Sequence, residues 1–330
     1  MVGLSHVAFR RLLRSYLPST AVTLWPTEML NSRRIPIENL TTTPETARHP
    51  NETELVPQIL GNEELPIARS VARLESEWGA EGIDINMGCP VKKALSHNYG
   101  VALMGDAQYA ADVVKMTVRH TRLPVSVKLR ATESGGSTEL IQFVRGLENA
   151  GASWITLHPR KPTQMRRGSA DWSQIREVRE NIGIAVIGNG DVQVASDAAQ
   201  MLHETSCDMV MVGRALTARP WLFWQVGELL GFPPPPGREG ERAPRTPAEE
   251  GQEASRALKH FASLMEEHYP GDLGMRKFRF FLRTSAPWLH FGHDLYARST
   301  KAKSFAELGT ALELFFQQEQ EMTARTELRQ

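Results

Sequence analysis

The sequence predicts an α/β protein, a (β/α)₈ TIM barrel followed by a smaller all-α domain. Up to about residue 230, short apolar runs rich in Val and Ile alternate with longer segments of helical period. A stretch rich in Pro and Gly follows at residues 231–251, and beyond it the pattern is almost wholly helical. We therefore expect a barrel domain at residues 1–230, a linker at 231–251 and a helical domain at 252–330.

Seven apolar runs and five helical segments carry the barrel prediction. The expected strands are residues 21–25, 55–60, 82–86, 125–129, 154–157, 185–188 and 209–213. The expected helices are residues 63–78, 107–120, 139–150, 172–180 and 194–204. This alternation is typical of parallel βαβ units, and the lack of a GxGxxG fingerprint after the first strand favours a barrel over an open doubly wound sheet. A polar turn at residues 3–6 looks like the loop after an eighth strand, so we expect the chain to begin just after or inside strand one.

The composition is that of an ordinary globular protein of 330 residues, with 41% hydrophobic and 23% charged residues. The sequence contains no apolar stretch as long as the ~20 residues that a membrane span requires, and it shows no signal-peptide pattern. We therefore expect a soluble protein. Cys89 and Cys207 are the only cysteines, and their spacing favours a reducing cytoplasm over a disulfide framework or a zinc site. The formal net charge is zero, so any affinity for nucleic acid must come from local patches.

Polar side chains follow nearly every predicted strand. In order they are Glu28, Gln58, Asn86 with Cys89, Lys128 with Arg130, His158 with Arg160, Asn189 with Asp191, and Gly213 with Arg214. In a (β/α)₈ barrel the carboxyl ends of the strands meet on one face, where active sites form. Residues i and i+2 of a strand share a side, so each Lys–Arg or His–Arg pair should point the same way.

The last two strands end in turns that suit a phosphate group. Residues 188–191 read Gly-Asn-Gly-Asp, and Gly213 precedes Arg214. Small residues let backbone N–H groups approach a phosphate, and a guanidinium lies beside them. A barrel phosphate site is expected after these strands, and two ordinary tight turns are the alternative.

Lys128 and Gln58 are candidates to hold a flavin. A lone Lys at the end of an apolar strand is costly to bury without an anionic partner, and a reduced flavin carries negative charge along its N1–C2=O edge. Gln58 could bond the pyrimidine edge of a flavin through both its donor and its acceptor. The alternatives are a salt bridge from Lys128 to Glu28 or Asp84, and a plain core hydrogen bond of Gln58.

Cys89 is the candidate proton donor. It lies in Asn-Met-Gly-Cys-Pro, directly after a predicted strand and before a polar stretch at residues 92–100 that could form a mobile loop. Free cysteines are more often inert core residues, which suits Cys207, but the position of Cys89 at the active face favours a function. An unperturbed thiol, with a pKa of about 8.5, is mostly protonated near neutrality and can donate a proton. His158 is either structural or forms an anion-binding pair with Arg160.

The segment at residues 84–90, Asp-Ile-Asn-Met-Gly-Cys-Pro, closely resembles the signature of the tRNA-dihydrouridine synthases, and the likeness is to the bacterial type. Further segments fit that family in order along the chain. They are residues 1–10 with 27–29, 57–61, 100–104, 127–130, 157–160, 188–191 and 212–214. The resemblance runs through the whole predicted barrel, and the helical part fits less well.

The resemblance implies a reduction of uridine to 5,6-dihydrouridine in RNA, with tRNA favoured as substrate, FMN as cofactor and NADPH as reductant. Hydride would pass from flavin N5 to uracil C6 while Cys89 delivers a proton to C5. FMN would be held by Met1, Gln58, Lys128, His158, Asn189, Gly190, Gly213 and Arg214. Asn86 and Arg130 would help place the uracil, with Arg160 as a further substrate contact. No metal or membrane partner is expected, and the protein is expected to be a monomer.

Two departures from the family pattern stand out. The chain begins at Met1, where relatives have a preceding apolar strand and an Ala-Pro pair, and Lys161-Pro162 follows the His-x-Arg segment where many relatives have a second Arg. Two other functions remain as alternatives: an FMN barrel oxidoreductase for a small molecule, and a catalytically inactive RNA-binding homologue. A small-molecule oxidoreductase would not explain a basic helical domain. The intact set of Cys89, Lys128 and His158 argues against an inactive homologue.

Positive charge is concentrated in one part of the helical tail. Its cations are Arg276, Lys277, Arg279, Arg283, Arg298, Lys301 and Lys303, with a single acidic residue, Asp294, among them. Aromatic residues interleave with these charges, so part of the segment must pack as core while the cations face outward. We expect an RNA-binding surface that includes Arg276 and Lys277, and a solvated helix face is the alternative.

Overall fold

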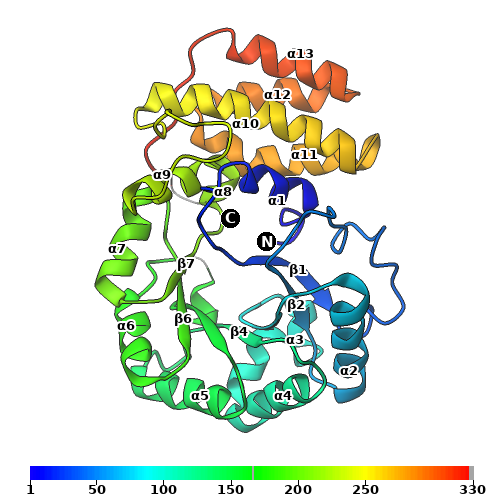
Figure 1. Cartoon of the computed structure of the whole chain (residues 1–330), viewed down its shortest axis with the longest axis vertical. Helices are drawn as coiled ribbons and strands as arrows, with labels where there is room; N and C mark the ends of the chain where they lie inside the picture. Colours follow the sequence, from blue (N-terminus) through cyan, green and yellow to red (C-terminus); the bar gives the residue numbers. More distant parts are fainter. Residues whose placement is uncertain (166, 327–330) are drawn as a thin grey trace. The chain divides into compact units, whose positions relative to one another are not determined.

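A seven-stranded parallel sheet, with its strands in sequence order, is the framework of the first part of the chain. The computed structural model describes residues 1–165 and 167–326, with only the backbone of Lys93. The strands are β1 (Trp25–Asn31), β2 (Leu55–Leu60), β3 (Ile83–Met87), β4 (Val125–Arg130), β5 (Trp154–His158), β6 (Ala185–Asn189) and β7 (Met209–Met211). Figure 1 shows the strands curling around one another, and the buried residues of β2 to β6 explain their near-continuous apolar sequences.

Helices and helical turns follow the strands, and Figure 1 shows the longer helices along the outside of the sheet. They are α2 (Glu64–Arg73), a π-helical turn (Leu74–Trp78), α3 (Lys92–Leu95), a 3₁₀ turn (Gly100–Gly105), α4 (Ala107–Arg119), α5 (Ser137–Asn149), a 3₁₀ turn (Pro162–Gln164), α6 (Trp172–Asn181) and α7 (Ala195–Thr205). Asp106 and Asp171 cap α4 and α6 by accepting backbone N–H groups. The predicted fold class, a TIM-barrel arrangement followed by a helical region, is confirmed.

The first predicted strand was placed wrongly. The apolar run at residues 21–25 contributes only Trp25, which pairs with Leu55, and the strand continues to Asn31. Pro26, which follows the predicted run, lacks an N–H donor for the sheet. Here it lies beside an irregularity in the pairing between Pro26 and Met29, a position where a strand tolerates proline.

Two compact units divide the chain. The first comprises Met1–Val2, Thr23–Asp191 and Gln200–Met211, and it holds the sheet. The second comprises Gly3–Val22, Val192–Ala199 and Val212–Gln330. Its helices are α1 (Val7–Arg14), α8 (Ala215–Ala218), α9 (Leu222–Leu229), α10 (Pro247–His268), α11 (Asp272–Ser285), a 3₁₀ turn (Ala286–Trp288), α12 (Gly292–Lys301) and α13 (Phe305–Phe316). None of the described helices is both long and apolar enough to cross a membrane.

The predicted linker overlaps a helix. Residues 231–246 contain no helix or strand, but α10 begins at Pro247, inside the segment that we expected to be linker to residue 251. Thr246 Oγ1 accepts a hydrogen bond from the Glu249 backbone N–H, and the Glu249 carboxylate accepts one from the Thr246 backbone N–H. This capping box, with proline in the first turn, starts the helix early. The domain limits at residues 230 and 252 remain a prediction.

The core of the second unit contains a buried charge as well as apolar side chains. Arg219 is 1% exposed; it donates to the Glu250 carboxylate and to the Thr323 carbonyl oxygen, and it lies over the ring of Trp288. Arg325 pairs with Asp197 at 2.5 Å. Both interactions join residues that are far apart in the sequence, so the C-terminal segment is part of this core.

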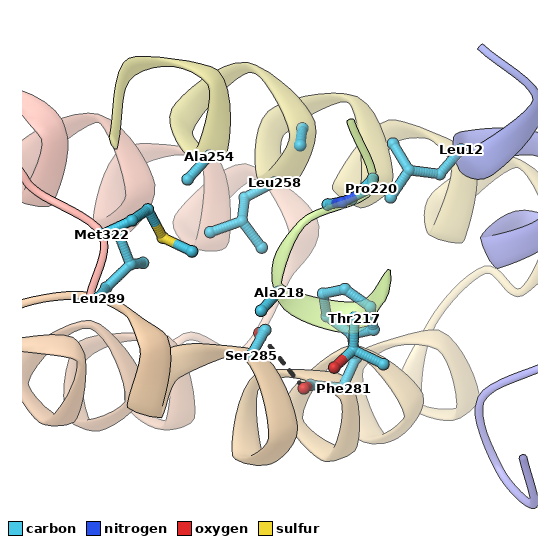
Figure 2. A pocket seen from close by; sticks show the side chains of 11 residues that line it. Leu12, Thr217, Ala218, Pro220, Ala254, Leu258, Phe281, Ser285, Leu289 and Met322 are labelled. Atoms are coloured by element: carbon cyan, nitrogen blue, oxygen red, sulfur yellow. Dashed lines mark hydrogen bonds between the residues drawn. The ribbon is translucent and has the colours of Figure 1, made fainter. Parts of the chain in front are cut away.

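Figure 2 shows a small apolar cavity in the same unit, with a volume of about 10 Å³. Leu12, Ala254, Leu258, Phe281 and Met322 are among the residues that line it. A space of this size is at the lower limit for one water molecule, so the helices are close to full packing density.

His6, next to the start of α1, is completely buried. Its ring stacks on Phe261 and meets Tyr269 edge-on, and neither ring nitrogen has a hydrogen-bond partner among the described residues. Burial lowers the pKa of His6 well below its usual value, and the charges of Lys277 and Arg10 lower it further. The folded protein therefore holds His6 neutral, whereas the unfolded chain binds a proton there below about pH 6.5.

Replacing His6 with Phe should reduce the loss of stability in acid. Because the folded-state pKa of His6 is lowered, the wild-type free energy of unfolding should fall as pH drops below 6.5, by up to ~1.4 kcal/mol per pH unit for this one proton. His6→Phe keeps an aromatic ring beside Phe261 and removes this proton. Denaturant unfolding between pH 5 and 8 measures the slope, and equal slopes for wild type and variant would contradict the assignment.

Candidate active site

Three polar side chains from neighbouring strands meet inside the sheet. Gln58 of β2 pairs with Asp84 of β3, which pairs with Ser126 of β4. The Asp84 carboxylate accepts from Gln58 Nε2 at 2.5 Å and from Ser126 Oγ at 2.6 Å. Burial raises the pKa of Asp84, although these hydrogen bonds and nearby Lys128 act in the opposite direction. Its carboxyl group is therefore held by neutral donors rather than by an ion pair.

Asn86 organises the turn that carries Cys89. Asn86 Oδ1 accepts from the backbone N–H groups of Gly88 at 3.1 Å and Cys89 at 2.9 Å, and Asn86 Nδ2 donates to Gln58 Oε1 at 2.7 Å. The Cys89 carbonyl accepts from the Val101 N–H, and a Cβ at Gly100 would lie 2.6 Å from that carbonyl oxygen. A side chain at position 100 would therefore displace the turn.

The thiol lies in a small apolar cluster in this conformation. Cys89 is 8% exposed and packs with buried Ala94 and Tyr99, against Met29 and Leu60. Ala94 belongs to the segment between β3 and α4, as does Tyr99, so this segment covers the thiol. The polar stretch that the sequence suggested as a loop is thus packed on the candidate proton donor.

Lys128 is half-buried and has no carboxylate contact among the described residues. Its Nζ donates to Asn189 Oδ1 at 3.2 Å, and Asn189 Nδ2 donates to the carbonyl oxygen of Met211. Burial lowers the pKa of Lys128 to about 8, the charge of Arg130 lowers it too, and Asp84 opposes the shift. The alternative for Lys128 was a salt bridge to Glu28 or Asp84. Neither salt bridge forms in the part of the chain that the structure describes.

Arg130 braces the Cys89 turn. Its Nε donates to the Gly88 carbonyl oxygen and its Nη1 to the Met165 carbonyl oxygen, both at 2.9 Å. The side chain is 8% exposed. Lys128 and Arg130 therefore lie on the same side of β4, as predicted, but Arg130 is also a structural link between two loops.

His158 and Arg160 form a pair with Asp191. Arg160 Nη2 donates to both Asp191 carboxylate oxygens at 2.6 and 2.8 Å, and its Nη1 lies 3.1 Å from His158 Nε2. Because a guanidinium can only donate, His158 Nε2 must accept, which places the imidazole proton on Nδ1. The predicted contact of Arg160 with substrate stays a prediction, since its guanidinium is engaged here by protein groups.

The turn after β6 packs tightly against neighbouring protein groups at position 190. Gly190 has φ +124°, and a Cβ there would lie 2.7 Å from the Ala170 Cβ and 3.0 Å from the His158 ring. Only glycine fits this position. Gly213 and Arg214 follow β7 and belong to the second unit, and their predicted part in phosphate binding stays a prediction.

Two features of the second unit bear on RNA binding. Lys277 lies over the ring of Tyr269 and Arg298 pairs with Asp294, whereas Arg276 and Arg283 are exposed cations of α11 without an ion pair among the described residues. A groove of about 440 Å³ is lined by Arg283, Leu289, Phe291, His293 and Tyr296, among others. Phe291 is 70% exposed and has φ +54°, a conformation that is uncommon for a bulky residue.

Sequence reasoning missed the role of Asp84 and Ser126. Asp84 was considered only as a salt-bridge partner, and Ser126 not at all. The signal was available in the spacing, since Asp84 and Asn86 are two residues apart on β3 and Ser126 and Lys128 are two apart on β4. The pairing register between strands, which brings Gln58 next to Asp84, could not be obtained from the sequence.

Together these features define an enzyme of the TIM-barrel class, with a thiol, a buried ammonium and oriented amides at the carboxyl ends of its strands. The model of the dihydrouridine synthase (Dus) family matches residues 1–289. The chain therefore belongs to the dihydrouridine synthase family, a family of oxidoreductases.

Relatives with curated names agree with this assignment. The chain is 32% identical over 327 residues to a probable tRNA-dihydrouridine synthase of Mycobacterium tuberculosis, covering 95% of this chain and 80% of that protein. It is 34% identical over 231 residues to one of Rickettsia conorii (70% and 68%), and 32% identical over 234 residues to tRNA-dihydrouridine synthase B of Proteus vulgaris (67% and 72%). A structure of a 2-naphthoyl-CoA reductase complex matches half of this chain and 28% of its own, at 15% identity and a TM-score of 0.41, which is too low to bear on the fold.

Lys128→Met should stabilise the ligand-free protein at pH 7. The folded-state pKa of about 8 is lower than the ordinary value of 10.5, so the charged form is disfavoured by folding. Removing the charge should raise the free energy of unfolding by roughly 1–3 kcal/mol. Between pH 8 and 10.5 the unfolded chain binds more protons, so the wild type should gain stability there and the difference should shrink. A less stable variant at pH 7 in denaturant unfolding would mean that the charge is paired.

Proposed function

We propose that this protein reduces uridine to 5,6-dihydrouridine in tRNA, with FMN as cofactor and NADPH as reductant. The observation that carries the proposal is the arrangement at the ends of β2, β3 and β4. A thiol turn, a buried ammonium and two oriented amides lie together there, in a chain of the dihydrouridine synthase family.

The residues of the first unit fit FMN. Lys128 is a half-buried cation whose only side-chain hydrogen bond among the described residues is to an amide oxygen, which suits an anionic flavin edge. Gln58 uses one N–H and one lone pair within the protein, and the remaining N–H and lone pair match the pyrimidine edge. The positive-φ turn at Gly190 permits close approach of a phosphate near Asn189 and His158.

The protein groups would place the uracil and supply its proton. FMN, when bound, supplies the hydride that reaches C6. Both lone pairs of Asn86 Oδ1 are used within the protein, so Asn86 can offer a ligand the second N–H of Nδ2, which suits a uracil carbonyl oxygen. Cys89 would donate its thiol proton to C5, and Arg130 would hold the Gly88 end of that turn.

We also propose that the second unit contacts the RNA through α11 and the groove beside it. Arg276 and Arg283 are seven residues apart, so they lie on the same face of α11, and Arg283 lines the groove with Phe291. Cations suit RNA phosphates, and an exposed aromatic ring suits an unstacked base.

Cys89→Ala should separate the two halves of the reaction. We expect reduction of bound FMN by NADPH to remain nearly intact and reduction of uridine in tRNA to slow by about two to four orders of magnitude, the range for a lost general acid. Rapid mixing would measure the first step and mass spectrometry of the RNA the second. Equal uridine reduction by variant and wild type would assign the proton to another group, and a wild type that neither contains nor takes up FMN would contradict the proposed cofactor.

Arg276→Ala combined with Lys277→Ala should raise the apparent KM for tRNA and make its salt dependence shallower, by about one unit of slope for each lost phosphate contact. Oxidation of NADPH by a non-RNA acceptor should not change. Arg298→Ala is the control, because Arg298 already pairs with Asp294. An unaltered KM and salt slope in the folded double variant would favour a solvated helix face.

A further inference from the structure

A continuous chain of hydrogen bonds connects Asp84 to the Cys89 turn. Asp84 accepts from Gln58 Nε2, Gln58 Oε1 accepts from Asn86 Nδ2, and Asn86 Oδ1 accepts from the backbone N–H groups of Gly88 and Cys89. Its lengths run from 2.5 to 3.1 Å. The side chains of Asp84, Gln58 and Asn86 are all at most 7% exposed.

At each end of this series of hydrogen bonds, the terminal group has a fixed role as donor or acceptor. The Asp84 oxygen that faces Gln58 is an acceptor, and backbone N–H groups are donors only. The amides of Gln58 and Asn86, which could otherwise be turned over, must therefore both point their oxygen atoms toward the turn and their nitrogen atoms toward Asp84. If either amide were reversed, two donors or two acceptors would face each other at a buried position, at a cost of about 1–3 kcal/mol for each unsatisfied group.

Strand geometry explains why position 84 can do this. Asp84 and Asn86 are two residues apart on β3, so their side chains share a side of the sheet, and Gln58 is the registered partner of Asp84 on β2. Ser126, the registered partner on β4, donates to the other carboxylate oxygen. Asp84 is thus held from both neighbouring strands.

We propose that Asp84 is a positioning residue for the Cys89 thiol, acting through Gln58 and Asn86 rather than through contact with substrate or cofactor. The proposal rests on the proposed function for its catalytic consequence. By setting the direction of both amides, Asp84 holds the Gly88 and Cys89 N–H groups on Asn86 Oδ1 and leaves Asn86 with an N–H to offer a ligand. The acceptor oxygen of Asp84 is the required feature, and its negative charge is not.

Three substitutions distinguish an acceptor from a charge. Asp84→Leu removes the acceptor and leaves Gln58 Nε2 unpaired. Asp84→Asn keeps an oxygen for Gln58, because its amide nitrogen can donate to Ser126 Oγ, which accepts as well as donates. Ser126→Ala is the matched control, since it removes the second hydrogen bond of Asp84 and leaves the chain to Cys89 intact.

Amide hydrogen exchange at Gly88 and Cys89 in the ligand-free full-length protein tests the geometry without any catalysis. We expect exchange there to be at least about tenfold faster in Asp84→Leu, with Asp84→Asn and Ser126→Ala within about threefold of wild type, since a lost hydrogen bond of ~1.4 kcal/mol corresponds to a factor of ten. Unchanged exchange at these two residues in Asp84→Leu would overturn the proposal. So would an equal effect of Asp84→Asn, which would show that the charge matters.

Kinetics of the FMN-loaded enzyme test the catalytic consequence. At saturating tRNA, kcat for uridine reduction should fall about 10- to 100-fold in Asp84→Leu, with KM for tRNA little changed, because a misplaced group affects the chemical step. A rise in KM alone would overturn the proposal. If Cys89→Ala left uridine reduction unaffected, the proposed function would fail while the exchange result could still stand.

A further variant covers the case in which Asp84→Leu does not fold. Asp84→Ala removes the same acceptor without placing a branched apolar side chain between β2 and β4. Exchange at Gly88 and Cys89 should then be faster than in Ser126→Ala, and identical exchange in the two variants would overturn the proposal.

Discussion

The structure depends on one constraint, which is that the polar side chains inside the sheet must find partners within the protein. Gln58, Asp84, Asn86 and Ser126 satisfy one another across β2, β3 and β4. Within the described part of the chain, the Lys128 ammonium donates only to an amide oxygen. This contrast separates the groups that shape the site from the group that is suited to an anionic ligand, because a buried charge without a countercharge is costly unless a ligand supplies one.

Most of the sheet could be predicted from the sequence because buried parallel strands are short, apolar and rich in Val and Ile. Residues 55–60 match β2 at both ends, and five of the other predicted strands differ from the structure by only one or two residues at their boundaries. The error at β1 arose at Pro26, where an irregular pairing removed the usual penalty for proline. The early start of α10 arose because Thr246, Pro247 and Glu249 form a cap inside a stretch whose composition indicated a linker.

The candidate site was predictable only in part. The period of two along a strand placed Lys128 and Arg130 on one side, and the position of Asn86 after an apolar run placed it with Cys89. Which partner each side chain takes depends on the register between strands and on the paths of the loops, and neither follows from spacing within one segment. For that reason the pairing of Arg160 with Asp191, the link from Arg130 to Met165 and the chain that starts at Asp84 emerged only with the structure.

The interactions of the last described residues affect the order in which the second unit can fold during synthesis. Arg219 donates to the Thr323 carbonyl oxygen, Thr323 N–H donates to the carbonyl oxygen of Trp288, and Arg325 pairs with Asp197. The buried guanidinium of Arg219 therefore lacks one of its acceptors until Thr323 has left the ribosome. Until then this unit can be collapsed but not complete, and it is then most exposed to proteases and chaperones.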